Sequence, residues 1–198
     1  LEQIGVRAGP MMAAGDSWRV IFSGTGGHGG EAPHLATDVT VAAGHFLLGV
    51  QTIVSRNIGA LDSAVVSVGY AAAGSHEGLN VMPSEFHLGG VCRSYLPHVR
   101  ETLRTRLTTL AETLAAAQGC TADVEYWRSG YPVINADAPA AAAQKAVIAA
   151  LGEDNLIADL PPTTGGEDFA EMMQVVPGCF AFLGNDNTGS ERVAGLHT

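Results

Sequence analysis

The sequence predicts an α+β fold, and three observations carry that prediction. Apolar residues alternate along several short segments and follow three-and-four spacing along others, which are the periods of strands and helices. Between residues 16 and 129 these segments follow one another as strand, helix, strand, strand, helix and strand. After residue 131 the chain turns alanine-rich and then rich in proline and glycine. The first order is that of a ferredoxin-like unit, a four-stranded antiparallel sheet with two helices on one face.

The first strand shows the two-residue period, and the first helix shows the three-and-four spacing. Asp16–Ser23 alternates large apolar residues with polar ones and predicts a strand. Residues 39–54 carry apolar side chains at three-and-four spacing, so they predict one amphipathic helix of about four to five turns. Thr37 or Asp38 can cap its start.

Two further strands come next. Ser63–Ala73 is apolar and β-branched, which is typical of a central strand. Ser84–Tyr95 alternates again, but it contains Gly89 and Gly90. Glycine inside a strand indicates a bulge or a close neighbour.

A long helix and a fourth strand complete this part. Pro97 suits a first helical turn, and a leucine stripe follows it until Gly119. Leu96, the residue before Pro97, brings no capping side chain. Thr121–Ser129 then predicts the last strand.

The remaining chain predicts two helices and one strand. Residues 135–152 are an alanine-rich helix, and residues 160–178 form a loop that opens a short helix. Residues 179–185 are expected to be a buried strand. One strand and two helices cannot close a core, so they are expected to belong to a larger α/β domain. The sequence therefore predicts three parts. Residues 1–15 precede the ferredoxin-like unit, residues 16–130 form it, and residues 131–198 belong to the larger α/β domain.

Composition narrows the function classes. The 198 residues carry a net charge of −10, which argues against nucleic acid as a partner. No run of eighteen apolar residues exists, so no membrane span is expected, and the first residues do not resemble a signal peptide. Three widely spaced cysteines predict reduced thiols and a cytoplasmic protein.

The glycine-rich stretch GTGGHGGEAPH, residues 24–34, has four interpretations. The first is a metal site, which is disfavoured because the spacing of His28 and His34 matches no common zinc pattern. Pro33 and His34 separate the glycines from any helix, which disfavours a phosphate cradle. A flexible turn with incidental histidines remains open. So does a rigid loop that presents an imidazole, which can donate a hydrogen bond to a developing oxyanion.

Several motifs occur together in one order. They are GPMMAAGDSWRVIFSGTGGHGGEAPH, VQTIVSRN, SAVVSV, GLNVMPSE, CRSYLPHVR, TTGGEDF, PGCFAFLGN and GLHT. In order and spacing they resemble the M20 metallopeptidase family over essentially the whole chain. The likeness is to its amidohydrolase branch, which includes hippurate hydrolases, N-acyl-amino-acid amidohydrolases and auxin-conjugate hydrolases.

The resemblance implies an architecture and a reaction. Family members have an α/β catalytic domain with two divalent metal ions (zinc, manganese or cobalt) and a ferredoxin-like lid that commonly dimerises. It implies hydrolysis of the amide bond of N-acyl or N-aroyl amino acids, and a homodimer formed through the lid. Of the family's metal ligands only the last, His197, is present, and the others are expected before Leu1. The chain by itself is therefore expected to bind no metal stably and to be inactive.

The resemblance also assigns residues. His28 matches a lid histidine that reaches a neighbouring subunit's active site and polarises the scissile carbonyl, while His34 is expected to bond the loop to itself. Asn80 and Arg93 match lid positions that recognise substrate, and a guanidinium can hold a carboxylate with two hydrogen bonds. Gly165 and Gly166 match residues that line the substrate cleft. His197 matches a metal ligand.

Two other functions stay open. The chain could be a non-catalytic dimerisation module that associates through an edge strand and an outer helix. A ferredoxin-like sensor of small molecules is a weaker alternative, because the GGEDF and GLHT motifs would serve no purpose in it.

Overall fold

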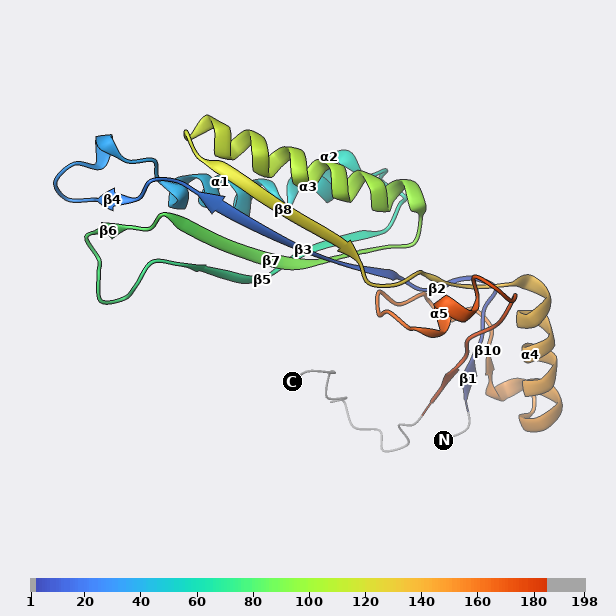
Figure 1. The fold of residues 1–198 in the computed structure, drawn as a ribbon. Coiled ribbons are helices and arrows are strands. Elements are labelled where there is room, and N and C mark those ends of the chain that lie inside the picture. The colour runs from blue at the N-terminus through green and yellow to red at the C-terminus, as the bar shows by residue number, and fades with distance from the viewer. Residues whose placement is uncertain (1–2, 185–198) are drawn as a thin grey trace. The chain divides into compact units, whose positions relative to one another are not determined.

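The computed structural model describes residues 3–184 and divides into two compact units (Figure 1). The first, called here the sheet unit, consists of Met12–Pro132 together with the short loop Thr164–Glu167. The second, the terminal unit, takes the chain up to Met11, Val133–Thr163 and the chain from Asp168 onward. Each unit is a mixture of helices and strands.

Four strands form the sheet of the sheet unit. They are β3 (Ala14–Ser23), β5 (Ala64–Ala73), β7 (Glu85–Ser94) and β8 (Thr121–Arg128). All neighbours are antiparallel, in the order β5-β7-β3-β8. Every strand lies within two residues of its predicted bounds. The alternation of apolar side chains therefore located these strands correctly.

Three helices cover one face of this sheet: α1 (Val39–Gly49), α2 (Thr52–Asn57) and α3 (Pro97–Ala117) (Figure 1). Asp38 caps α1 by accepting a hydrogen bond from the Thr40 N–H, as predicted. The single helix expected over residues 39–54 is wrong, because the structure has two consecutive helices there. The Thr52 hydroxyl donates to the Gly49 carbonyl at 2.7 Å, and this side-chain bond stands at the break between them.

The core lies between the helices and the sheet. Phe46 of α1 meets Trp18 and Phe22 of β3 edge-on, with ring centroids 6.0 and 5.6 Å apart. Leu103 and Leu107 of α3 are fully buried in the same cluster. Burying a side chain of this size contributes about 1.5–3 kcal/mol. The leucine stripe of α3 therefore has the role that its spacing predicts.

Of the two glycines of β7, Gly90 has a packing reason and Gly89 has none. A β-carbon at Gly90 would stand 2.6 Å from the ring of Trp18, so glycine lets the indole lie against the strand. The irregularity in strand pairing falls in the neighbouring β5, between Val68 and Tyr70. The close neighbour that the sequence suggested is thus on β7, and the bulge is on the strand beside it.

A small two-stranded antiparallel ribbon extends from one end of the sheet, and we call it the hairpin although its two strands are far apart in the chain. It pairs β4 (Gly27–His28) with β6 (Val81–Met82), and a 3₁₀ turn, η1 (Pro33–Leu35), follows β4 (Figure 1). This hairpin contains most of the glycine-rich stretch.

The terminal unit is built from short elements. Its three-stranded sheet joins β1 (Ile4–Gly5) to β10 (Leu156–Ile157) and β11 (Phe182–Leu183), and a further pair joins β2 (Gly9–Met12) to β9 (Val133–Asn135). The helices are α4 (Asp137–Leu151), η2 (Glu153–Asn155) and α5 (Phe169–Met172).

One expectation for the terminal unit is wrong. The strand predicted as buried over residues 179–185 is reduced to β11, and Leu183 is 63% exposed. The reason is its position, because within residues 3–184 β11 pairs only with β1 and lies at the edge of a three-stranded sheet. Asn135 anchors this segment by accepting from the Phe180 N–H and donating to the Phe180 carbonyl.

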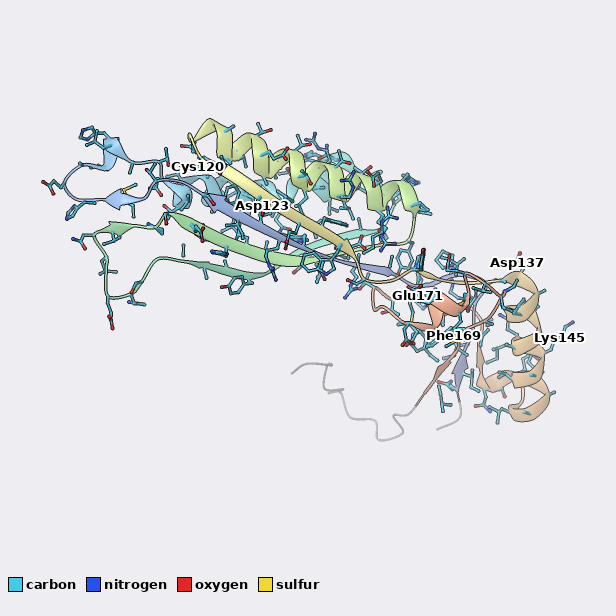
Figure 2. All side chains as sticks on the ribbon, viewed as in Figure 1. Cys120, Asp123, Asp137, Lys145, Phe169 and Glu171 are labelled. Atoms are coloured by element: carbon cyan, nitrogen blue, oxygen red, sulfur yellow. The ribbon has the colours of Figure 1, made fainter. Side chains whose placement is uncertain are left out.

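Figure 2 shows the side chains of the terminal unit on its elements. Asp137 stands at the start of α4, where the helix dipole stabilises a carboxylate. Lys145 lies on the exposed side of the same helix. Phe169 of α5 contacts Phe180, with ring centroids 6.1 Å apart, and this contact fixes α5 beside the last described segment.

The three cysteines are unpaired, as expected. Within residues 3–184, no helix combines the length and the apolar character that a membrane crossing requires.

Candidate functional site

The glycine-rich loop is held by close backbone packing. Gly26 has φ +61°, and a β-carbon there would lie 2.8 Å from the Met82 carbonyl oxygen, so no other residue fits without strain. Thr25 and Thr37 bridge the base of the loop through two hydrogen bonds between backbone N–H groups and hydroxyl oxygens, of 2.8 and 2.9 Å. The Gly29 N–H donates to the Asn80 carbonyl. The loop is therefore a braced hairpin, which favours a presented imidazole over a flexible turn.

His28 stands at the exposed tip of this hairpin with both ring nitrogens engaged. Its Nδ1 accepts a hydrogen bond from the Glu31 N–H at 3.0 Å, and the side-chain amide of Asn80 lies 3.1 Å from its Nε2. A neutral imidazole accepts at one nitrogen and donates at the other. Because Nδ1 accepts, the proton of the neutral ring is on Nε2. The Asn80 side-chain nitrogen faces Nε2, so this tautomer requires the carboxamide to turn by half a rotation and offer its oxygen instead.

The structure thus brings together two of the residues singled out from the sequence, His28 and Asn80, which are 52 positions apart. The surroundings of the pair are apolar and open to solvent. Leu35, Leu79 and Val81 are 76%, 87% and 60% exposed. We call this group of five residues the hairpin tip.

His34 does not behave as expected. It lies in the 3₁₀ turn after the hairpin and is exposed. In the part of the chain that the structure describes, its side chain makes no hydrogen bond, so the expectation that it bonds the loop to itself is wrong. The turn is held by backbone bonds instead, from the Leu35 and Ala36 N–H groups to the Ala32 and Pro33 carbonyls.

Arg93, Gly165 and Gly166 form a second group. Arg93 lies near the end of β7, opposite Gly15 of β3. The Ala13 N–H donates to the Gly165 carbonyl at 3.0 Å, which holds the Thr164–Glu167 loop against the start of β3. A β-carbon on Gly166 would lie 3.6 Å from Nη1 of Arg93. We call these three residues the arginine group.

The hairpin tip and the arginine group lie at opposite ends of the sheet. Arg93 pairs with Gly15 at the start of β3, whereas Ser23 at the other end of β3 leads to the hairpin. The strand between Gly15 and Ser23 spans roughly 25 Å, at about 3.3 Å per residue. One substrate the size of an amino acid conjugate cannot touch both groups of the same chain.

The structure also contains a buried polar group that sequence reasoning missed. Arg100 of α3 and Asp16 of β3 form an ion pair, with Nε 2.9 Å from Oδ2, and the Tyr126 hydroxyl donates to the same oxygen at 2.7 Å. Arg100 also donates to the Gly130 carbonyl at 2.8 Å. A signal existed in the sequence, because Arg100 falls on the apolar stripe of its helix.

The pKa values within this group follow from hydrogen bonding and burial. The hydrogen bond to Asp16 raises the pKa of Arg100, which keeps the guanidinium charged. Burial raises the pKa of the Cys92 thiol to about 12 and that of the neighbouring Tyr126 hydroxyl as well. These groups are fixed in one protonation state near neutral pH, so they serve as structural partners for Asp16 and not as acids or bases.

The residues described here do not form a metal site. His197 lies outside the described residues. Within residues 3–184, no group of three or more histidine, cysteine, aspartate or glutamate side chains could hold a metal ion.

Comparison with known proteins places the chain among peptidases and amidohydrolases. The profile of peptidase family M20/M25/M40 matches residues 3–198. N-acetylcysteine deacetylase of Bacillus subtilis is 35% identical over 93% of this chain and 47% of its own length. IAA-amino acid hydrolase ILR1-like 5 of Arabidopsis thaliana is 32% identical over 100% of this chain and 46% of its own length.

A solved structure agrees in fold. The Bacillus subtilis YXEP protein, a dinuclear metal binding peptidase from the M20 family, superposes with a TM-score of 0.71 at 28% identity. The match covers 90% of this chain and 43% of that one. The chain therefore spans about half the length of the curated relatives it matches.

Proposed function

The chain belongs to peptidase family M20/M25/M40, and from this premise we propose that it takes part in hydrolysing the amide bond of N-acyl or N-aroyl amino acids. One observation carries the proposal: His28 and Asn80 meet at 3.1 Å on a braced, exposed hairpin. The relatives named as an N-acetylcysteine deacetylase and an IAA-amino acid hydrolase support this substrate class.

In this proposal the hairpin tip serves the scissile carbonyl. With Nδ1 occupied by the Glu31 N–H, the neutral ring directs its Nε2 proton outward. That proton can be donated to the carbonyl oxygen as negative charge develops on it, which stabilises the transition state more than the ground state. Asn80 holds the ring in this orientation until substrate arrives.

The arginine group serves the carboxylate of the amino acid. A guanidinium matches a carboxylate with two parallel hydrogen bonds. Arg93 lies beside the Thr164–Glu167 loop, where Gly166 has no side chain that would stand between the guanidinium and the backbone. Substrate would thus be bound at its charged end by Arg93 and polarised at its amide by His28.

The distance between the two groups supports a homodimer. Because they lie at opposite ends of one sheet, a substrate that contacts both needs the hairpin tip of one copy and the arginine group of another. The order β3-α1-α2-β5-β7-α3-β8 and the sheet order β5-β7-β3-β8 support reading Met12–Pro132 as a ferredoxin-like lid that makes this dimer.

Two divalent metal ions belong to the proposed complete site, where they would supply an activated water. The described residues do not fit such a pair of ions, so every step assigned here is performed by side chains of this chain. The proposal also includes a cytoplasmic location. It further includes a small-molecule partner in place of nucleic acid, and the net charge of −10 supports this choice of partner.

The test is an assay of the purified chain with N-acetyl and N-benzoyl amino acids in the presence of zinc, manganese or cobalt. About two bound metal equivalents with turnover would support the hydrolase. A dimer that binds no metal and shows no turnover would support the dimerisation module instead.

A matched pair of variants then tests the hairpin tip. In a full-length version of the enzyme that contains this chain, His28→Ala should lower kcat by about tenfold or more, because it removes a hydrogen bond to developing charge. His34→Ala, in the same loop but without a hydrogen bond, should leave kcat unchanged. Equal rates for the two variants would remove His28 from the mechanism.

A further inference from the structure

Gly15 has no backbone reason to be glycine. It lies in the regular part of β3, pairs with Arg93 of β7, and its φ is outside the left-handed region. Glycine inside a strand is destabilising relative to alanine. A contact must therefore explain the residue.

The contact is with Arg93. Nη1 of Arg93 occupies the place where a β-carbon of Gly15 would stand, and Cζ lies 3.3 Å from that place. Within residues 3–184, and apart from Gly15 and its two chain neighbours, no other heavy atom comes within 4 Å of it. Gly15 is consequently buried, although it lies on the face of the sheet opposite the helices.

This contact sets the direction of the Arg93 side chain. By crossing β3 over Gly15, the guanidinium comes to lie beside Gly166, because a β-carbon built on Gly166 would be 3.6 Å from Nη1. In the described part of the chain, the guanidinium makes no hydrogen bond or ion pair. Its N–H donors are therefore available to a ligand beside the Thr164–Glu167 loop.

We propose that Gly15 is a positioning residue: its missing side chain leaves the path along which Arg93 reaches the Thr164–Glu167 loop. The inference rests on the proposed function in that Arg93 is taken to bind the substrate carboxylate. A methyl group at position 15 would displace the guanidinium from this path. Because the displaced atoms are the far end of a flexible side chain, the fold itself should tolerate the change.

The first test follows the Arg93 side chain directly. In ¹⁵N NMR spectra of the 198-residue chain, Gly15→Ala should shift the Nε–H resonance of Arg93 while the core resonances stay in place. The matched control is Gly89→Ala, a glycine on the same face whose β-carbon would meet no atom closer than 3.5 Å. It should leave the Arg93 resonance unchanged. An unmoved Arg93 resonance in Gly15→Ala would overturn the proposal.

The second test measures binding of N-acetylglycine by titration in the same spectra. Gly15→Ala should weaken binding by about tenfold, as expected for losing hydrogen bonds to a charged group. In the Arg93→Ala background, Gly15→Ala should cause no further loss. An equal loss in both backgrounds would mean that Gly15 acts through the strand and not through Arg93, which contradicts the proposal.

The two tests separate this inference from the proposed function. If N-acetylglycine leaves the Arg93 resonance of the unmodified chain unmoved, the carboxylate role of Arg93 fails. The displacement of Arg93 by Gly15→Ala would still establish Gly15 as its positioning residue.

Discussion

Single polar side chains of the sheet unit differ in how much water reaches them, and this difference separates their roles. Asp16 and Cys92 are 2% and 1% exposed, and each is surrounded by fixed partners. His28 and Asn80 are exposed and paired mainly with each other. A buried group contributes to stability and changes charge with difficulty, whereas an exposed donor can exchange its partner for a ligand.

The pKa of Cys92 predicts a loss of stability at alkaline pH. The folded thiol ionises near 12 and the unfolded thiol near its ordinary value of 9.0, because burial disfavours the thiolate. The folded state thus holds this proton more tightly, so the contribution is complete below pH 9 and decreases as pH rises from 9 toward 12. The expected slope is about 1.4 kcal/mol per pH unit.

The measurement is urea unfolding of the unmodified chain and of Cys92→Val between pH 8 and 10.5. The variant cannot ionise at this position, so its stability should fall less steeply with pH. Parallel profiles for the two proteins would contradict the assignment. Burial and Cys92 both raise the pKa of Tyr126, so Cys92→Val also reduces the alkaline slope that Tyr126 contributes.

At the scale of elements, α3 is joined to the sheet by both apolar and ionic contacts. Its buried leucines belong to the core between helices and sheet, while Arg100 binds Asp16 of β3 and the Gly130 carbonyl that follows β8. One guanidinium therefore contacts both ends of the segment that makes up the sheet unit. The start of α3, by contrast, has no side-chain cap.

Removing the buried guanidinium should be costly. Arg100→Met leaves the Asp16 carboxylate buried without its cation, which destabilises a protein by about 3–5 kcal/mol. The control is Arg104→Met on the same helix, which removes an exposed ion pair with Glu101. Denaturant unfolding should show a large loss for the first variant and almost none for the second. Similar losses would mean that burial does not distinguish the two pairs.

The uncapped start of α3 predicts a stabilising substitution. Leu96 has extended dihedrals, φ −104° and ψ 135°, and precedes the helix without a cap hydrogen bond. Leu96→Ser supplies an oxygen for a free N–H of the first turn and should add about 1 kcal/mol. Leu96→Ala removes the same side chain without adding the oxygen. Thermal unfolding should rank serine above alanine, and the reverse order would exclude capping.

At the scale of the whole molecule, the position of the two groups determines what one chain can do. The hairpin tip and the arginine group are separated by the length of β3. The sheet also has open edges at β5 and β8, and edge strands favour pairing with another chain. Both features favour association of two copies.

The expected mass in solution is therefore twice the chain mass of 20.4 kDa. Sedimentation or light scattering would measure it. In an active preparation, mixing His28→Ala with Arg93→Ala should restore part of the turnover that each variant loses alone, because one mixed site receives both intact groups. A monomer, or mixtures that stay inactive, would show that the groups do not act across two copies.

Local patterns in the sequence determined the four strands of the sheet, the long helix α3 and the cap at Asp38. Their physical basis is short-range, since alternation and three-and-four spacing report which side of an element meets the core. The break between α1 and α2 escaped this reasoning because residues 39–54 keep an apolar stripe through it. The exposed β11 escaped it because edge position depends on strand partners far away in the chain.

The same division holds for the site. The sequence by itself determined which residues to consider, His28, Asn80 and Arg93, and that the glycine-rich stretch needs a special backbone. Only the tertiary structure decided that His28 and Asn80 pair, that Arg93 crosses Gly15, and that these groups lie at opposite ends of one sheet. Residue types and local periods are written along the chain, whereas distances between remote residues are fixed by strand register and packing.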